Sequence, residues 1–292
     1  MSTLWQNIQY KMLRSGNKLN LLIGINVIVY LLINVSAILE QLLFRGFGNS
    51  AILVYTNEYL LLPAYPPKLL THFWTPLTYM FMHAGILHIL FNMLWLYWMG
   101  QIFEEYLGNK RTIGLYIMGG LAGALAYVLC LNFIPAFTSS NAAVGSTIVG
   151  ASASVMAIVV ATATLLPNYT ISLILFGPVK LKWLVFVILV IDFLGIVGPN
   201  AGGEIAHLGG ALLGFIYIKQ LQKGHDWIGG ISSIFTSRSK LKVVTKNSNK
   251  NSVERPRQED IDRILDKISQ TGYESLSKQE KEILFRASNN ES

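Results

Sequence analysis

The stretch VGASASVMAIVV, residues 149–160, is almost wholly apolar and yet carries two hydroxyl side chains just after a glycine. Ser152 and Ser154 lie in a run that contains no charged residue. Serine in an apolar helix commonly serves as a small residue that lets two helices approach each other. The alternative is that one serine takes part in chemistry inside a membrane, and the surrounding sequence has to decide between the two.

The composition indicates a protein that crosses a membrane several times. Of the 292 residues, 52% are hydrophobic and only 13% are charged, whereas soluble proteins carry about 25% charged residues. The single cysteine, Cys130, excludes an intramolecular disulfide and any metal cluster built from cysteines. The net charge of +7 comes from basic residues at the chain ends and in short loops, which signals membrane topology rather than nucleic-acid binding. We therefore expect the lipid bilayer, and no nucleic acid, as a partner.

Six apolar segments are long enough, or nearly long enough, to cross a bilayer as helices. A hydrocarbon core about 30 Å thick requires roughly 20 apolar residues in a helix. The six segments are residues 19–43, 74–103, 112–134, 146–166, 182–198 and 204–220. The start of the fifth is ambiguous, because Gly177 and Pro178 interrupt the apolar run ahead of it. The sequence predicts an all-α membrane protein with a six-helix membrane domain over residues 19–222.

Basic residues predict how this bundle is oriented. An even number of spans places both termini on the same side of the membrane. Lysine and arginine accumulate in the N-terminal segment 1–18, in the turns after the second and fourth spans, and after the sixth span, whereas the opposite loops hold only Arg45 and Lys68. Because basic residues stay inside, we expect both termini to be cytoplasmic, in an integral protein of the bacterial inner membrane.

The chain beyond the sixth span differs in composition from the rest. Residues 223–256 are polar and basic, as in a flexible linker, and residues 257–288 have the pattern of two short helices. Apolar residues share one face of the first helix: Ile261, Ile264, Leu265 and Ile268. Ser277 and Glu280 have the spacing of a capping box at the start of the second. Two helices this short cannot bury a core of their own, so we expect this helical cytoplasmic tail to dock on an unidentified partner.

Polar residues recur at a similar depth in three of the predicted spans, nearer the outer face: His83, His88, Asn92, Ser152 and His207. His88 and Asn92 are four residues apart and share a helix face. Small residues beside Ser152 and His207 would let their two helices come close. A serine next to a histidine is an activated nucleophile, and a helix N-terminus favours negative charge. Each residue alone is commonly structural, but their joint occurrence favours a catalytic site.

Three motifs in this order, MHAGILHILFNMLWLYWMG, GASASVMA and AHLGGALLGF, make the chain resemble the rhomboid family of intramembrane serine proteases. The resemblance covers roughly residues 19–222. It implies a six-helix bundle in which Ser152 is the nucleophile and His207 the base of a catalytic dyad. It also implies that His88 and Asn92 stabilise the oxyanion, and that single-pass or polytopic membrane proteins are the substrates.

Some positions near the expected site depart from the family pattern. Ala153 stands where glycine is common, Met156 where an aromatic ring often stacks on the histidine, and Thr75 where an arginine often follows a tryptophan. Alanine is small, and a thioether can lie against an imidazole, so neither change near the serine argues against activity. We expect Gly150, Met156 and His83, which matches the family's upstream histidine, to line the site.

Other kinds of site and other classes of protein fit less well. A metal on the histidines would leave the serine and the glycines unexplained, so no metal and no cofactor is expected. Asp192 and Glu204 are the acidic candidates near the sixth span, but no third acid is evident, which favours a dyad. A rhomboid-like protein that binds membrane clients without cleaving them is expected to lack Ser152 or His207, and both are present. A transporter predicts internal repeats, which the sequence does not show.

Overall fold

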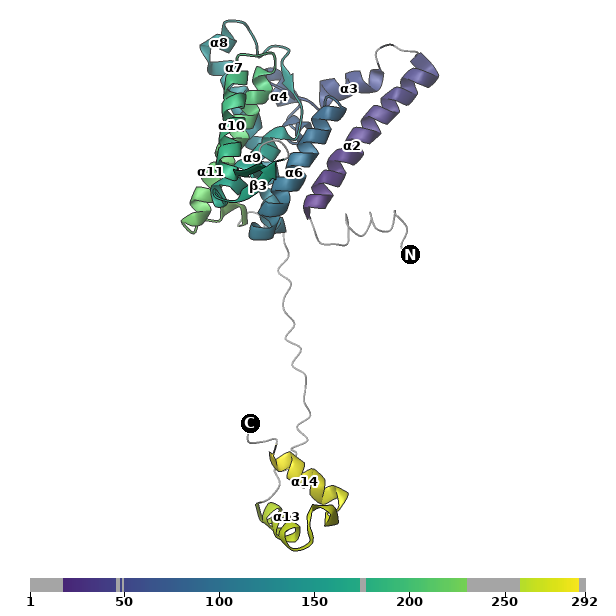
Figure 1. The fold of residues 1–292 in the computed structure, drawn as a ribbon. Coiled ribbons are helices and arrows are strands. Elements are labelled where there is room, and N and C mark those ends of the chain that lie inside the picture. The colour runs from purple at the N-terminus through teal and green to yellow at the C-terminus, as the bar shows by residue number, and fades with distance from the viewer. Residues whose placement is uncertain (1–17, 46–47, 49, 174–176, 230–257, 289–292) are drawn as a thin grey trace. The chain divides into compact units, whose positions relative to one another are not determined.

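The computed structural model of the chain describes residues 18–45, 48, 50–173, 177–229 and 258–288. The chain divides into two compact units, Met1–Ser237 and Arg238–Ser292, and each unit has its own architecture (Figure 1). The expected N-terminal segment 1–18 and most of the expected linker 223–256 lie outside the described residues.

The first unit consists of helices joined by short turns and two small sheets (Figure 1). Its long helices are α2 (Lys18–Glu40), α6 (Ile86–Leu107), α7 (Asn109–Phe133) and α11 (Ala201–Gln222), and two shorter ones are α9 (Ser152–Leu165) and α10 (Leu181–Gly195). The connecting helices are the π-turn η2 (Gln41–Arg45), α3 (Ala51–Tyr59), α4 (Pro66–Thr71), α5 (Thr75–Thr78), η3 (Tyr79–Phe81) and α8 (Pro135–Thr138). The sheets pair β1 (Leu62–Pro63) with β2 (Thr147–Ile148), and β3 (Thr170–Leu173) with β4 (Gly177–Lys180), both antiparallel.

Four of the described helices are long and apolar enough to cross a membrane: α2 with its π-turn, α6, α7 and α11. Helices α9 and α10 have 14 and 15 residues, so at 1.5 Å per residue they extend over only about 21–23 Å. Each of the six expected apolar segments overlaps one of these six helices. The helical membrane architecture is confirmed, and six complete crossings stay a prediction.

Helix α9 lies at the centre of this unit, packed against α6, α7 and α11. Its burial on all sides, with 11 of its 14 residues buried, explains an apolar sequence without a polar face. Gly210 and Gly214 of α11 lie against the backbone carbonyls of Ala153 and Ala157, and a Cβ at either glycine would overlap them. The expected close approach of these two helices is confirmed, and it brings the first turn of α9 beside the part of α11 that carries His207.

The start of α9 is set by tertiary pairing of the preceding residues. Leu62 pairs with Ile148 across β1 and β2, and the Gly150 N–H donates to the Tyr79 carbonyl at 3.0 Å. Gly150 has φ +131°, a backbone conformation that residues other than glycine rarely adopt. The helix expected over residues 146–166 therefore begins only at Ser152, because the residues before it are held in extended pairing.

The segment expected to enter the second span as one helix is broken. Thr75–Thr78 and Tyr79–Phe81 form short turns, the backbone is extended at Met82, and α6 begins only at Ile86. The Tyr79 hydroxyl donates to the Gly120 carbonyl at 2.6 Å, so tertiary bonds fix this part of the chain apart from α6. The prediction that His83 lies on the same helix as His88 is wrong, because His83 precedes that helix.

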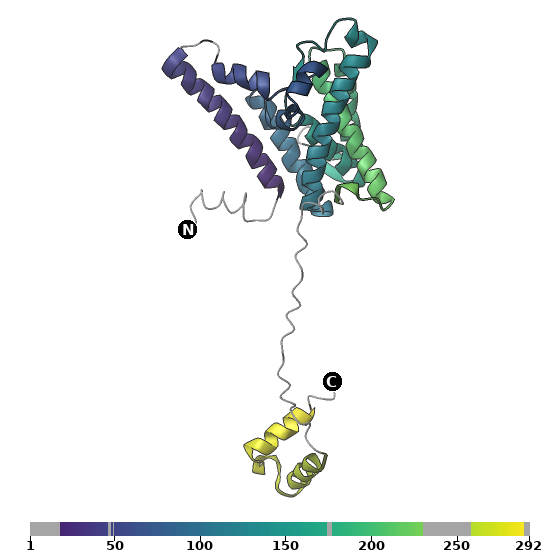
Figure 2. The ribbon, with the colours of Figure 1, turned by 180° about the vertical axis from the view of Figure 1, so that it is seen from behind.

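Helix α2 joins the rest of the unit chiefly through its N-terminal half. The backbone N–H groups of Lys18 and Leu19 donate to Glu104 of α6 at 3.2 Å each, and Asn26 donates to the Tyr116 hydroxyl of α7 at 3.0 Å. Toward its C-terminal end the helix diverges from α6, as Figures 1 and 2 show from opposite sides.

Packing of the first unit continues past the end of α11. Arg111 of α7 forms an ion pair with Asp226 at 2.7 Å, the Trp227 ring lies edge-on to Tyr217 at 5.3 Å, and Ile228 is 2% exposed. Burial raises the pKa of Asp226, but hydrogen bonds, first of all from Arg111, outweigh burial and hold that pKa below its usual value. Residues 226–229 are thus part of the packed unit.

These contacts predict different outcomes for two truncations. A chain ending after Gly229 should keep an intact membrane domain with unchanged thermal unfolding in detergent. A chain ending after Gln222 loses the buried Ile228 and leaves Arg111 without its partner, so it should be less stable by about 2–4 kcal/mol. Equal unfolding temperatures for the two truncated proteins would contradict the assignment of residues 226–229 to this unit.

The second unit is a pair of helices, α13 (Gln258–Thr271) and α14 (Lys278–Ser288), with the short turn η4 (Tyr273–Ser275) between them. The expected capping box is present: Ser277 N–H donates to Glu280 at 2.7 Å, and Glu280 N–H donates to the Ser277 hydroxyl at 3.3 Å. Ile264 is buried, whereas Leu265 and Phe285 remain exposed. The two predicted helices are confirmed, and the pair leaves apolar side chains uncovered within its own unit.

Candidate active site

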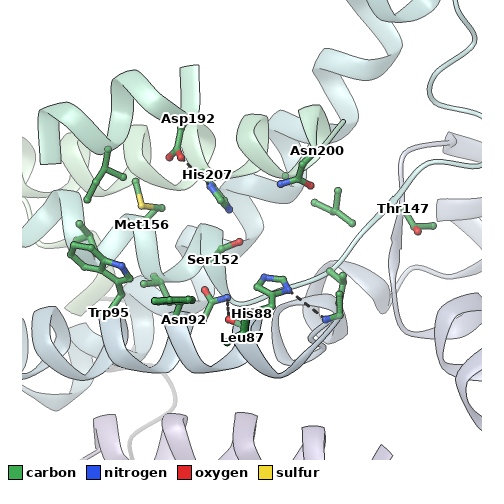
Figure 3. A pocket seen from close by; sticks show the side chains of 18 residues that line it. Leu87, His88, Asn92, Trp95, Thr147, Ser152, Met156, Asp192, Asn200 and His207 are labelled. Atoms are coloured by element: carbon green, nitrogen blue, oxygen red, sulfur yellow. Dashed lines mark hydrogen bonds and ion pairs between the residues drawn. The ribbon is translucent and has the colours of Figure 1, made fainter. Parts of the chain in front are cut away.

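A cavity of about 630 Å³ opens between α6, α9, α10 and α11 and gathers the polar residues of these helices (Figure 3). Its wall includes Ser152, His207, His88, Asn92, Met156 and Asp192. The four residues with expected catalytic roles, which come from three different helices, therefore face one cavity. Much of the remaining wall is apolar, from residues such as Leu87, Phe91 and Val155, which suits an extended apolar substrate segment.

Ser152 is the first residue of α9. A helix N-terminus presents N–H groups that have no partner inside the helix, and its dipole favours negative charge nearby. Ser154, two residues on, is 1% exposed, and its hydroxyl lies 4.0 Å from the Met80 sulfur, away from the cavity wall. Of the two serines in the apolar run, Ser152 is therefore the one available for chemistry, because it faces the cavity, whereas Ser154 packs between helices.

His88 and Asn92 present hydrogen-bond donors from α6. The Ala84 N–H donates to His88 Nδ1 at 3.4 Å, which leaves the proton of a neutral ring on Nε2. The Asn92 amide donates one hydrogen to the His88 carbonyl at 2.9 Å and keeps a second one for another acceptor. A Cβ at Gly150 would lie 2.8 Å from His88 Nε2. The glycine thus gives the His88 ring the space that it occupies next to Ser152.

His207 is held on its Nδ1 side by two carboxylates. Nδ1 lies 3.5 Å from Asp192 Oδ1 of α10 and 3.4 Å from Glu204 Oε2, one turn earlier on α11. In Figure 3 the ring stands between Asp192 and Ser152. Glu204 in turn accepts a hydrogen bond from Asn200 at 3.1 Å. The sequence indicated a dyad without a third acid, whereas the structure places two acids against the histidine.

Sequence reasoning had one signal for each of these acids. Asp192 is an ionisable residue within an apolar span, and such residues usually face a protein interior. Glu204 lies three residues before His207, a spacing that brings two side chains together on a helix. What the sequence did not reveal is the packing of α10 against α11, which brings the Asp192 carboxylate to the same ring nitrogen.

His83 lines a second cavity of about 330 Å³, whose wall also includes residues of α2 and α3. Its ring contacts His88 edge-on, with ring centroids 5.2 Å apart, so it supports the site residue from behind. Among the described residues, both of its ring nitrogens are buried without a hydrogen-bond partner. Of the three residues expected to line the site, only Met156 belongs to the wall of the first cavity. Gly150 and His83 both contact His88 instead.

One group of side chains has the composition of a metal site. In the part of the chain that the structure describes, ligand atoms of Asp192, Glu204 and His207 lie within 4.8 Å of one another. One imidazole and two carboxylates form a donor set that zinc accepts. The direct contacts of His207 Nδ1 with both carboxylates use the same atoms and account for the arrangement without an ion.

The fold and the site define a helical membrane protein with a serine and a histidine on one cavity. A family model for the rhomboid domain matches residues 70–223, more than half of the chain, and the chain belongs to the rhomboid family. It is accordingly an integral membrane protein. A second model, a family of unknown function (DUF6576), matches residues 245–290, which include the paired helices of the second unit.

Curated proteins with similar sequences come from plants, animals and bacteria. The chain is 31% identical to RHOMBOID-like protein 12, mitochondrial, of Arabidopsis thaliana, over 51% of this chain and 47% of that protein. It is 30% identical to Presenilin-associated rhomboid-like protein A, mitochondrial, of Danio rerio, over 51% of this chain and 37% of that protein. It is 27% identical to Rhomboid protease GlpG of Salmonella choleraesuis (strain SC-B67), over 31% of each chain. The match thus spans less than half the length of each of these relatives.

Proposed function

We propose that this chain is an intramembrane serine endopeptidase that hydrolyses peptide bonds in or near the transmembrane segments of other membrane proteins. The observation that carries the proposal is the shared cavity, in which Ser152 of α9, His207 of α11, and His88 and Asn92 of α6 face one another. A similar protein from Salmonella bears the name of a protease.

In the proposed reaction, His207 Nε2 takes the proton of the Ser152 hydroxyl, and Oγ attacks the scissile carbonyl carbon. The carbonyl oxygen becomes an oxyanion, held by N–H groups at the start of α9 and by donors from His88 and Asn92. Collapse breaks the C–N bond, and His207 gives the proton to the leaving amine. A water molecule then attacks the acyl-enzyme with His207 as base, which releases the acid product and restores Ser152.

The alternative function is that of a rhomboid-like protein that binds membrane clients without cleaving them. It requires the cavity and the membrane fold but no reactive pair. The presence of both Ser152 and His207 on the cavity wall favours the protease. No cofactor or metal takes part in the proposed chemistry.

The basic residues of the chain support a proposal for its orientation. Six crossings by residues 19–222 would place both termini on the same side of the membrane, and the basic residues near them indicate the cytoplasmic side. The helices within residues 257–288 would bind a partner there. A bacterial inner membrane stays a prediction as well, since two of the relatives above are mitochondrial by name and one is bacterial.

Purified protein in liposomes tests the function directly. Single-pass membrane proteins are reconstituted together with the purified protein, and mass spectrometry of the fragments locates any cleaved peptide bond. The protease predicts a cut in or within a few residues of the apolar segment. Stable association with such proteins, without fragments from a panel of transmembrane sequences, would support the client-binding alternative.

The oxyanion donors give a further prediction. Asn92→Ala should lower kcat by about 10²-fold, because removal of one donor to an oxyanion typically has this effect, while KM changes little. The matched control is Asn34→Ala, since Asn34 makes the same hydrogen bond to the carbonyl four residues earlier, at 2.9 Å, but lies in the second cavity. A rise in KM alone for Asn92→Ala would reassign Asn92 to substrate binding.

A further inference from the structure

We infer that Asp192 and Glu204 are positioning residues for His207, so that the site works as a serine, a histidine and a pair of carboxylates. The inference rests on the proposed protease function and concerns the same cavity. It replaces the dyad that the sequence indicated with an arrangement specific to the side chains of this chain.

The geometry gives both acids the same target. Asp192 Oδ1 and Glu204 Oε2 lie 3.5 and 3.4 Å from one atom, His207 Nδ1. These distances allow an ion pair and are longer than an ideal hydrogen bond, and catalytic contacts commonly shorten when substrate binds. A proton on Nδ1 points toward both carboxylates and leaves the lone pair on Nε2, the nitrogen that must accept the serine proton.

The two acids differ in burial, which suggests that they stabilise the positively charged His207 ring to different degrees. The Asp192 side chain is 10% exposed and the Glu204 side chain 19%. Asn200 holds Glu204, whereas among the described residues Asp192 Oδ2 is buried without a hydrogen-bond partner. A buried carboxylate whose contact is His207 gains most when that ring becomes positive.

This arrangement acts at a defined step. When Ser152 Oγ bonds to the carbonyl carbon, its proton moves to His207 Nε2, and the ring becomes an imidazolium with a proton on each nitrogen. The carboxylates stabilise that cation and keep the ring from turning while the Nε2 proton passes to the leaving amine nitrogen. Neither acid gains or loses a proton in the cycle.

The test compares kcat/KM as a function of pH for full-length wild type, Asp192→Asn, Glu204→Gln and the double variant. Each single variant should lower kcat/KM by no more than about tenfold, because the other carboxylate remains, and Asp192→Asn should lose more than Glu204→Gln. The double variant should lower it by about 10⁴-fold, the loss seen when the acid of a triad is neutralised. Its acid limb should move to lower pH by about one unit or more, because the charges that favour the imidazolium are gone. Glu58→Gln, an equal charge change at an exposed acid of α3 paired with Lys68, is the matched control and should leave the profile unchanged.

The pH profile separates positioning from a purely structural role. A loss of activity with an unmoved acid limb, or with a lowered unfolding temperature that accounts for it, would overturn the inference. So would wild-type activity that a chelator abolishes and zinc restores, since the acids would then act through a cation. A wild type that neither cleaves substrate nor reacts with a serine-directed probe would overturn the proposed function itself.

Discussion

Ser152→Ala is expected to lower the cleavage of a transmembrane substrate by about 10⁶-fold, the scale of loss when a serine protease loses its nucleophile. His207→Ala should lose about as much, because the alkoxide cannot form without a base. Since the two residues act as a unit, the double variant should be no slower than either single one. Rates are compared in liposomes at equal amounts of folded protein.

Ser154→Ala is the matched control for this prediction. It removes the same hydroxyl from the same helix two residues away, but the Ser154 side chain packs toward Met80 and Gly120 instead of the cavity. Its activity should therefore stay within a fewfold of wild type. Full activity in Ser152→Ala, or a loss in Ser154→Ala equal to that in Ser152→Ala, would contradict the assigned nucleophile.

The second large effect is expected at a glycine outside the cavity wall. Alanine is favoured over glycine inside a helix by about 1 kcal/mol, so propensity alone predicts that Gly210→Ala stabilises α11. The added Cβ would overlap the carbonyl oxygen of Ala153, which belongs to a buried helix and cannot move freely. We expect a net destabilisation of about 2 kcal/mol. Activity should fall about 10²-fold, since a shift of α11 by 1 Å displaces His207 from Ser152.

Gly100→Ala is the control for the packing argument. Gly100 is also a helical glycine with a close neighbour, but that neighbour is the tip of the Leu19 side chain, which can rotate away. Thermal unfolding in detergent should show little change for Gly100→Ala and a clear decrease for Gly210→Ala. Equal unfolding temperatures for the two variants would show that α9 and α11 are not in the tight contact described above.

The sequence predicted the helices well because long apolar runs with few alternatives must form helices in lipid. It also predicted the close approach of the two helices that carry Ser152 and His207, because small residues on both helices permit it. It placed His83 on the helix of His88, whereas His83 lies in the break before Ile86, because that break depends on the tertiary hydrogen bonds of Tyr79 with Gly120 and Gly150.

The acids at His207 show a different limit of sequence reasoning. Glu204 could be paired with His207 by spacing, but Asp192 comes from another helix, and its position follows from how α10 packs on α11. Likewise, α9 is shorter than its apolar run because β2 and Gly150 hold the preceding residues in extended form. Sequence patterns indicate which residues are buried, whereas the contacts between helices depend on the whole packed unit.

The most direct measurement is the site of covalent labelling by a fluorophosphonate in purified full-length protein. The proposed mechanism predicts one adduct, found by mass spectrometry on Ser152, formed by wild type and by Ser154→Ala but not by Ser152→Ala, and strongly slowed in His207→Ala. An adduct on another residue, or no adduct in a wild-type preparation with an intact unfolding transition, would contradict the claim that Ser152 is an activated nucleophile.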